Sequence, residues 1–308
     1  MPASTITRNS LQELLQDEPY LIRTLSELTQ QSSETVRNRF QRELSSLGSQ
    51  VQIAARDFGL QPHAWDSRLE DFYASTDAFL FETLVWNRHS VKQRMRDWIV
   101  RHLAASNQGP CRILTFGDGL GIDSLALAQA GHRVEYFEVS ARCIEFTRRA
   151  ARRLDTDLTI ISDANAIPNA AYDAVVCLDV LEHVPDPPTL VAKLASYLRP
   201  EGQLIVHAPF WYLHPAVVTH LASNRTYSGD TRRLYQSHGL DPIDGRFFWA
   251  PLALRKRKQG GAIVHPKIST RARLAFSGLL LSVARWWAWP HVRISGMLVM
   301  RTTAYRTA

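Results

Sequence analysis

The sequence has 308 residues, of which 45% are hydrophobic and 21% charged, a globular composition in which extensive disorder is not expected. Its three cysteines, Cys111, Cys143 and Cys177, have neither paired nor metal-ligand spacing. They argue against a disulfide framework and favour a reducing compartment, the cytoplasm. The chain does not open on a basic segment followed by an apolar run, so export is not indicated.

The net charge of +7 admits attraction to nucleic acid, anionic lipid or an acidic substrate. The arginines are spread over several segments, and only Arg255 to Lys258 forms a tight basic cluster. That cluster has no interleaved aromatic residues on which nucleobases could stack. We therefore expect a solvated basic surface, and a nucleic acid partner is not favoured.

Residues 8–105 repeat apolar positions at three- and four-residue spacing, which predicts a helical accessory or lid region over residues 1–107. Residues 69–103 are rich in aromatics, for which we expect core packing, with contact to a ligand as the alternative. Gly109 and Pro110 then interrupt the pattern and mark a domain boundary.

Residues 108–308 are predicted to form a second domain. From Ile113, apolar runs alternate with helical patterns, and such alternation predicts an α/β fold with a doubly wound, mostly parallel sheet. Residues 245–256 and 293–305 also resemble strands, and a helical insertion is expected between them, near residues 259–290.

The apolar stretch 273–285 is too short to span a bilayer. We expect a helix packed on the domain. An interfacial helix with weak peripheral membrane contact is the alternative, because arginines and Trp286, Trp287 and Trp289 flank this stretch.

Gly117, Gly119 and Gly121 follow a predicted strand and open a predicted helix, where glycines allow the backbone to approach a ligand. A dinucleotide would place its pyrophosphate there, and Asp118 and Asp123 would repel it. S-adenosylmethionine carries an ammonium and a sulfonium but no phosphate. The acidic glycine loop therefore favours S-adenosylmethionine as the cofactor.

Two further acids follow strands. Glu138 ends the second strand 17 residues after Gly121, where a carboxylate can accept hydrogen bonds from ribose hydroxyls. Asp163 ends the third strand, and we expect it near the adenine amino group. Each acid alone is more often a loop residue or a helix cap, but their placement at successive strand ends supports a nucleoside site.

The segment 113–209 resembles the class I S-adenosylmethionine-dependent methyltransferases, particularly the subgroup with small-molecule O-methyltransferases. "GDGLG", "YFEVS", "SDANAIP", "YDAVVCLDVLEHVPDP" and "LASYLRPEGQLIV" match the family's motifs in order and spacing. The resemblance implies a Rossmann-like methyltransferase sheet. It also implies a set of cofactor-binding residues: Gly117, Asp118, Gly119, Gly121, Glu138, Val139, Asp163, Ala164 and Asp179.

The chain departs from the family at Thr115, where an acid two residues before the first glycine commonly orients the methionine end. Asp118 could supply that charge from within the loop, or it could face solvent instead. The sequence does not decide between these two positions of the Asp118 side chain.

Methyl transfer displaces an already good leaving group, so catalysis consists mainly of proximity, orientation and, where needed, deprotonation of the acceptor. The resemblance places Asp179 near the methyl group and the acceptor. His183 is a candidate base near neutral pH, with a structural role at a helix start as the alternative. His207 and His214 complete the candidate catalytic set.

A metal-dependent alternative joins Asp179, Glu182 and His183 as ligands of magnesium, manganese or an iron-like ion, as in methyltransferases that grip a diol. The same "LEHV" string occurs widely in metal-free members of the family, and spacing fixes no fourth ligand. We therefore predict that no metal is needed.

The stretch after the fifth strand, 207–230, holds groups suited to binding an acceptor. They are His207, Trp211, Tyr212, His214, His220, Asn224 and Tyr227.

The sequence thus predicts transfer of a methyl group to a small-molecule, natural-product or peptide acceptor. The alternative is a methyltransferase of RNA or protein, although the fourth strand lacks the Asn/Asp-Pro-Pro-Tyr/Phe motif of many N-methyltransferases. A nicotinamide-dependent oxidoreductase and a non-catalytic cofactor-binding protein are weaker alternatives. The oligomeric state is not predicted.

Overall fold

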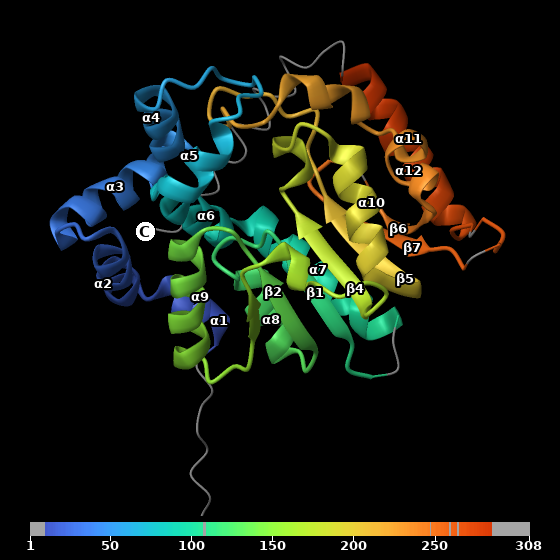
Figure 1. Cartoon of the computed structure of the whole chain (residues 1–308), viewed down its shortest axis with the longest axis horizontal. Coiled ribbons are helices and arrows are strands. Elements are labelled where there is room, and N and C mark those ends of the chain that lie inside the picture. Colours follow the sequence, from blue (N-terminus) through green and yellow to red (C-terminus); the bar gives the residue numbers. More distant parts are fainter. Residues whose placement is uncertain (1–9, 107–108, 247, 259, 264, 285–308) are drawn as a thin grey trace, which may run out of the picture.

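The computed structural model describes residues 10–106, 109–246, 248–258, 260–263 and 265–284. A central sheet is flanked by helices, and α2 to α5, between residues 18 and 75 in the N-terminal part of the chain, gather to one side of it, whereas α7 (Ser90–Ser106) lies against the sheet (Figure 1). The predicted strand 293–305 and Trp286, Trp287 and Trp289 lie outside the described residues.

The region before the first strand is helical, as the apolar periodicity predicts, and its described residues form seven helices. They are α1 (Leu11–Gln16), α2 (Glu18–Thr29), α3 (Ser33–Ser45), α4 (Ser49–Asp57), α5 (Leu69–Ser75), α6 (Ala78–Arg88) and α7 (Ser90–Ser106). Local signals place their ends: Ser10 and Glu13 form a capping box at α1, and Ser32 caps α3 through the Thr35 amide. The apolar faces of α1, α2, α3 and α6 share one core with α8 and α9.

The described residues form a sheet of seven strands in the order β3-β2-β1-β4-β5-β7-β6. The strands are β1 (Arg112–Phe116), β2 (Arg133–Phe137), β3 (Thr159–Ile161), β4 (Tyr172–Leu178), β5 (Leu198–His207), β6 (Leu240–Gly245) and β7 (Leu252–Lys256). The first five are parallel, and β7 pairs antiparallel with both β5 and β6. The predicted doubly wound, mostly parallel sheet is confirmed.

Helices cover both faces of the sheet, as a parallel sheet requires. The helices that follow β1 are α8 (Ile122–Gln129), α9 (Ala141–Arg153), α10 (Pro187–Tyr197), α11 (Thr231–Leu234) and α12 (Ile268–Ala284). Short 3-10 helices are η1 (Ala164–Ala166), η2 (Leu181–His183), η3 (Ala222–Tyr227) and η4 (Gln236–His238). α10 packs on one face, and α7 with α8 packs on the other.

The helix α12 lies in the region predicted as a helical insertion. It packs through Leu281 against Trp211 and Tyr212, while Phe276 and Leu279 are 64% and 61% exposed. No helix in the described part of the chain is both long and apolar enough to cross a bilayer.

Candidate active site

The glycine loop joins β1 to α8 at the carboxyl edge of the sheet. The Gly117 amide donates to the carbonyl oxygen of Phe137 at 2.9 Å and so ties the loop to β2. Gly121 has φ +67°, and a Cβ there would overlap the side chain of Thr147 on α9. Only glycine allows both this backbone conformation and this approach of α8 to α9.

Glu138 lies at the end of β2, as the sequence predicts, with its side chain in the wall of a cavity. Its carboxylate accepts from the amides of Gly119, Val139 and Ser140 at 2.9, 2.8 and 3.0 Å. Burial raises its pKa, and these amides oppose that rise. Val139 beside it is 64% exposed, so an accessible apolar side chain lies next to the fixed carboxylate of Glu138.

The carboxylates of Asp118 and Asp123 are both engaged in contacts within the protein, and neither lines the cavity. Asp118 accepts from the backbone amide and the hydroxyl of Ser124 at 2.7 and 2.5 Å, and it does not line the cavity. Asp123 pairs with Lys92 at 3.1 Å and with Arg96 at 2.8 Å, both on α7. The contacts of Asp118 and Asp123 therefore weaken the argument that these acids would repel a pyrophosphate. The prediction of S-adenosylmethionine as the cofactor depends instead on the series of family motifs.

Asp163 and Ala164 lie further along the same edge. Asp163 caps η1 by accepting from the Asn165 amide at 2.9 Å, and neither residue lines the cavity. Their contact with adenine stays a prediction.

Asp179 follows β4 with φ +58° and faces three donors. It accepts from Trp86 Nε1 at 2.9 Å, Lys92 Nζ at 3.2 Å and His207 Nδ1 at 2.5 Å. Burial opposes its ionisation, but Lys92 and His207 outweigh burial and lower its pKa. His207 Nε2 lies 2.9 Å from the Phe248 carbonyl oxygen, and His207 does not line the cavity. His207 thus contacts Asp179 from outside the cavity wall, and its catalytic role stays a prediction.

Glu182, His183 and His220 form a second cluster. Both oxygens of Glu182 are buried without a hydrogen-bond partner among the described residues. Glu182 Oε1 lies 3.8 Å from His183 Nε2 and 3.9 Å from His220 Nε2. Burial raises the pKa of Glu182, lowers that of His183 to about 4, and lowers that of His220 well below its usual range. Near neutral pH both imidazoles are therefore uncharged.

The other ring nitrogens of these histidines are engaged. His220 Nδ1 lies 2.8 Å from the Tyr212 carbonyl oxygen, and His183 Nδ1 lies 3.2 Å from that of Thr219 and 3.1 Å from Tyr73 Oη. A carbonyl only accepts, so each Nδ1 carries the proton and each Nε2 is free to accept one.

The atoms of Glu182, His183 and His220 that could ligate an ion lie within 4.8 Å of one another. The fold therefore brings His220, and not Asp179, to the Glu182 and His183 of the metal alternative. Asp179 is taken up by Trp86, Lys92 and His207.

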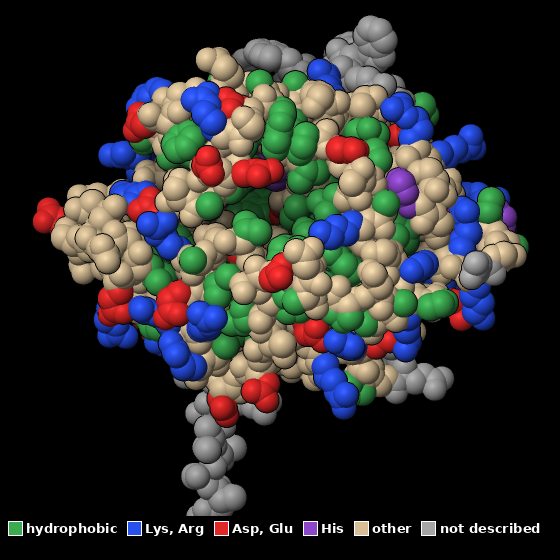
Figure 2. Space-filling model, in the orientation of Figure 1, with side chains coloured by type: hydrophobic (Ala, Val, Ile, Leu, Met, Phe, Trp, Pro, Cys, Tyr) green, Lys and Arg blue, Asp and Glu red, His purple; other side chains and the backbone are tan. Residues whose placement is uncertain are grey.

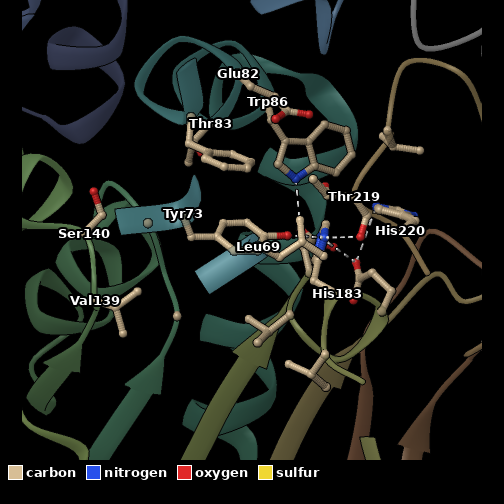
Figure 3. A pocket seen from close by; sticks show the side chains of 18 of the residues that line it. Leu69, Tyr73, Glu82, Thr83, Trp86, Val139, Ser140, His183, Thr219 and His220 are labelled. Atoms are coloured by element: carbon tan, nitrogen blue, oxygen red, sulfur yellow. Dashed lines mark hydrogen bonds and ion pairs between the residues drawn. The ribbon is translucent and has the colours of Figure 1, made fainter. Parts of the chain in front are cut away.

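One cavity of about 670 Å³ joins these groups. Gly117, Gly119, Glu138 and Val139 line one part of it, and Tyr73, Glu82, Trp86, His183, Thr219, His220 and Tyr212 line another. The surface view shows a hollow with hydrophobic walls and acidic side chains at its rim (Figure 2). In the close-up, Tyr73, Glu82, Thr83 and Trp86 face this space from α5 and α6, opposite His183 (Figure 3).

Of the seven predicted acceptor residues, Tyr212 and His220 line the cavity, and five do not: His207, Trp211, His214, Asn224 and Tyr227. Trp211 packs on Trp249 and Leu281, and His214 stacks on Tyr212 with ring centroids 5.7 Å apart. Sequence reasoning missed Glu82, Trp86 and Lys92. The aromatic density of residues 69–103 was a signal for Trp86, whereas neither charged residue stands in a recognisable motif.

A family model described as "Methyltransferase domain" matches residues 87–249, which is more than half of the chain. Curated relatives include a ubiquinone biosynthesis O-methyltransferase of Xylella fastidiosa, 30% identical over 151 residues, covering 46% of this chain and 58% of the relative. The enzyme of the same name from Aromatoleum aromaticum is 31% identical over 120 residues, covering 38% and 50%. The chain thus spans about half the length of the curated relatives it matches.

Among solved structures, a magnesium protoporphyrin IX methyltransferase from Synechocystis with bound S-adenosylmethionine matches with 24% identity and a TM-score of 0.46. The match covers 63% of this chain and 99% of that one.

Proposed function

The chain belongs to the class I S-adenosylmethionine-dependent methyltransferases, and from this premise we propose that it methylates a small-molecule acceptor. The observation that carries the proposal is the single cavity of about 670 Å³, which continues from the glycine loop and Glu138 to aromatic walls and the His183 cluster. A cavity of this size can hold a ligand of small-molecule dimensions. Natural products and short peptide segments are included in this acceptor class, and a biosynthetic role follows the names of the curated relatives.

The cofactor is S-adenosylmethionine. Glu138 is held by three backbone amides with its side chain on the cavity wall, a placement suited to accepting from ribose hydroxyls. Val139 offers an exposed apolar face to the adenine ring. Transfer from a sulfonium needs no metal, because the thioether is already a good leaving group.

In the reaction, the bond between the methyl carbon and sulfur breaks with its electron pair left on sulfur. The acceptor atom forms the new bond to carbon, and an acceptor hydroxyl gives its proton to a base. His183 is the candidate base, since burial keeps its imidazole uncharged and its Nε2 free to accept. Asp179, fixed by Trp86, Lys92 and His207, holds the carboxyl end of β4 in place beside the reacting groups.

We also propose a cytoplasmic location, because the three cysteines are buried free thiols.

Titration calorimetry with the purified full chain tests the cofactor. We expect binding of S-adenosylmethionine and its demethylated product and no binding of NAD. Tight binding of NAD with no response to S-adenosylmethionine would overturn the proposal.

A further inference from the structure

The acids on the cavity wall differ in what compensates their charge. Among the described residues, five acidic side chains line the cavity: Glu70, Glu82, Glu138, Asp179 and Glu182. Backbone amides hold Glu138, cationic side chains hold Asp179, and two imidazoles face Glu182. Glu70 is exposed to solvent. Glu82 is half-buried, its carboxylate, like that of Glu182, has no hydrogen bond to a described residue, and no described cation or imidazole lies within ion-pair distance of it.

The position of Glu82 is fixed by its neighbours on α6. Thr83 packs against the glycine loop, where a Cβ added at Gly119 would lie 3.0 Å from Thr83 Cγ2. Trp86, one turn further along the same helix face, donates to Asp179 at 2.9 Å. Figure 3 shows Glu82 next to Thr83 and Trp86 on this wall. Glu82 therefore lines the cavity from the same helix whose next residues contact the glycine loop and Asp179.

In the part of the chain that the structure describes, no cationic side chain pairs with Glu82. Burial, with repulsion from Glu43 and Asp179, raises the pKa of Glu82 to about 8. A cation that enters the cavity beside Glu82 would favour its ionised form. The family's usual acid before the first glycine is absent, because Thr115 stands there, bonded to Ser124. Asp118, the other candidate for that charge, is turned away onto Ser124.

We propose that Glu82 is a cofactor-binding residue whose carboxylate faces the sulfonium of S-adenosylmethionine. The negative charge that the family commonly places two residues before the first glycine then has its counterpart in the N-terminal helical region. This assignment rests on the proposed function. It implies that Glu82 favours the charged methyl donor over S-adenosylhomocysteine, which has lost the sulfonium charge.

Calorimetry on the full chain tests this with both ligands between pH 6.5 and pH 9. At pH 9 we expect Glu82→Gln to weaken S-adenosylmethionine binding about tenfold, an energy of about 1.4 kcal/mol. S-adenosylhomocysteine should change less than threefold. The effect of Glu82→Gln should shrink at pH 6.5, because wild-type Glu82 then carries a proton. Glu70→Gln is the matched control from the rim of the same cavity, and both affinities should stay within twofold.

The wild-type protein provides a second measurement that needs no variant. The ratio of its affinities for S-adenosylmethionine and S-adenosylhomocysteine should increase from pH 6.5 to pH 9. Titration of the amino group affects both ligands alike, so it does not change this ratio. A ratio that stays flat overturns the inference. The inference is also overturned if the folded Glu82→Gln protein binds both ligands more weakly by the same factor, or binds both as tightly as the wild type does. Failure of the wild type to bind S-adenosylmethionine at all would instead contradict the proposed function.

Discussion

The two halves of the cavity are built differently. The half near Glu138 consists of one loop and the next strand end, held by backbone amides within 23 residues of sequence, Gly117 to Ser140. The opposite half combines α5 and α6 with residues 209–220, and its contacts join side chains more than a hundred positions apart, such as Tyr73 and His183. A local, backbone-built site tolerates little change, whereas a wall of side chains from distant segments can vary without disturbing the loop.

The largest expected effect comes from Asp179, which joins the two halves. Asp179→Ala leaves Lys92 and His207 buried with one acceptor fewer, so we expect about 3 kcal/mol less stability and loss of most turnover. Urea unfolding and a methylation assay measure these. Glu201→Gln breaks an exposed pair with Lys258 and should cost under about 0.5 kcal/mol. Equal stability of the two variants would contradict the role given to Asp179.

Next comes Glu138 on the backbone-built side. Glu138→Ala should weaken S-adenosylmethionine binding by about 1 to 3 kcal/mol, because ribose hydroxyls and three amides lose their acceptor. Calorimetry measures the change. Glu135→Gln on the same strand, outside the cavity, should leave the affinity as it is. Unchanged affinity in folded Glu138→Ala would show that Glu138 is not the ribose acceptor.

On the side-chain-built half, Tyr212 lines the cavity whereas Trp211 and His214 do not. Tyr212→Ala should lower turnover about tenfold with cofactor affinity within threefold, under roughly 1 kcal/mol. Trp211→Ala and His214→Ala should affect turnover less. Steady-state kinetics beside calorimetry separates the two properties. If all three variants keep full activity, or if they lose the cofactor as Glu138→Ala does, acceptor selection resides elsewhere.

The smallest expected effect is that of a chelator. We expect turnover to be unchanged, because methyl transfer from a sulfonium requires no Lewis acid. Activity that is lost on chelation and restored by magnesium or manganese would reverse this prediction. It would also assign Glu182, His183 and His220 as the ligands, and a Glu182→Gln variant insensitive to the added ion would identify them.

The parts that the sequence predicts well are those encoded locally. The strands β1 to β5, the glycine turn and the place of Glu138 after β2 follow from period, turn residues and spacing within one segment, whereas the strand order comes from the structure. The role of Lys92 could not be predicted this way. It depends on ion pairs with Asp123 and Asp179, which lie 31 and 87 positions further along the chain. His220 lies next to Glu182 because η3 and the loop before it fold back over η2. No local sequence pattern predicts this long-range contact.

The roof of the cavity includes a close contact between Gly48, at the start of α4, and the backbone of Ala216. Gln52 Nε2 donates to the carbonyl oxygen of Pro215 in the same place. During synthesis, the N-terminal helices leave the ribosome early and must wait for residues 215–216, which come after β5. A nascent chain that ends at β5 has a complete glycine loop and Glu138 but no closed chamber. The glycine loop and Glu138 are thus synthesised before the residues that close the chamber opposite them.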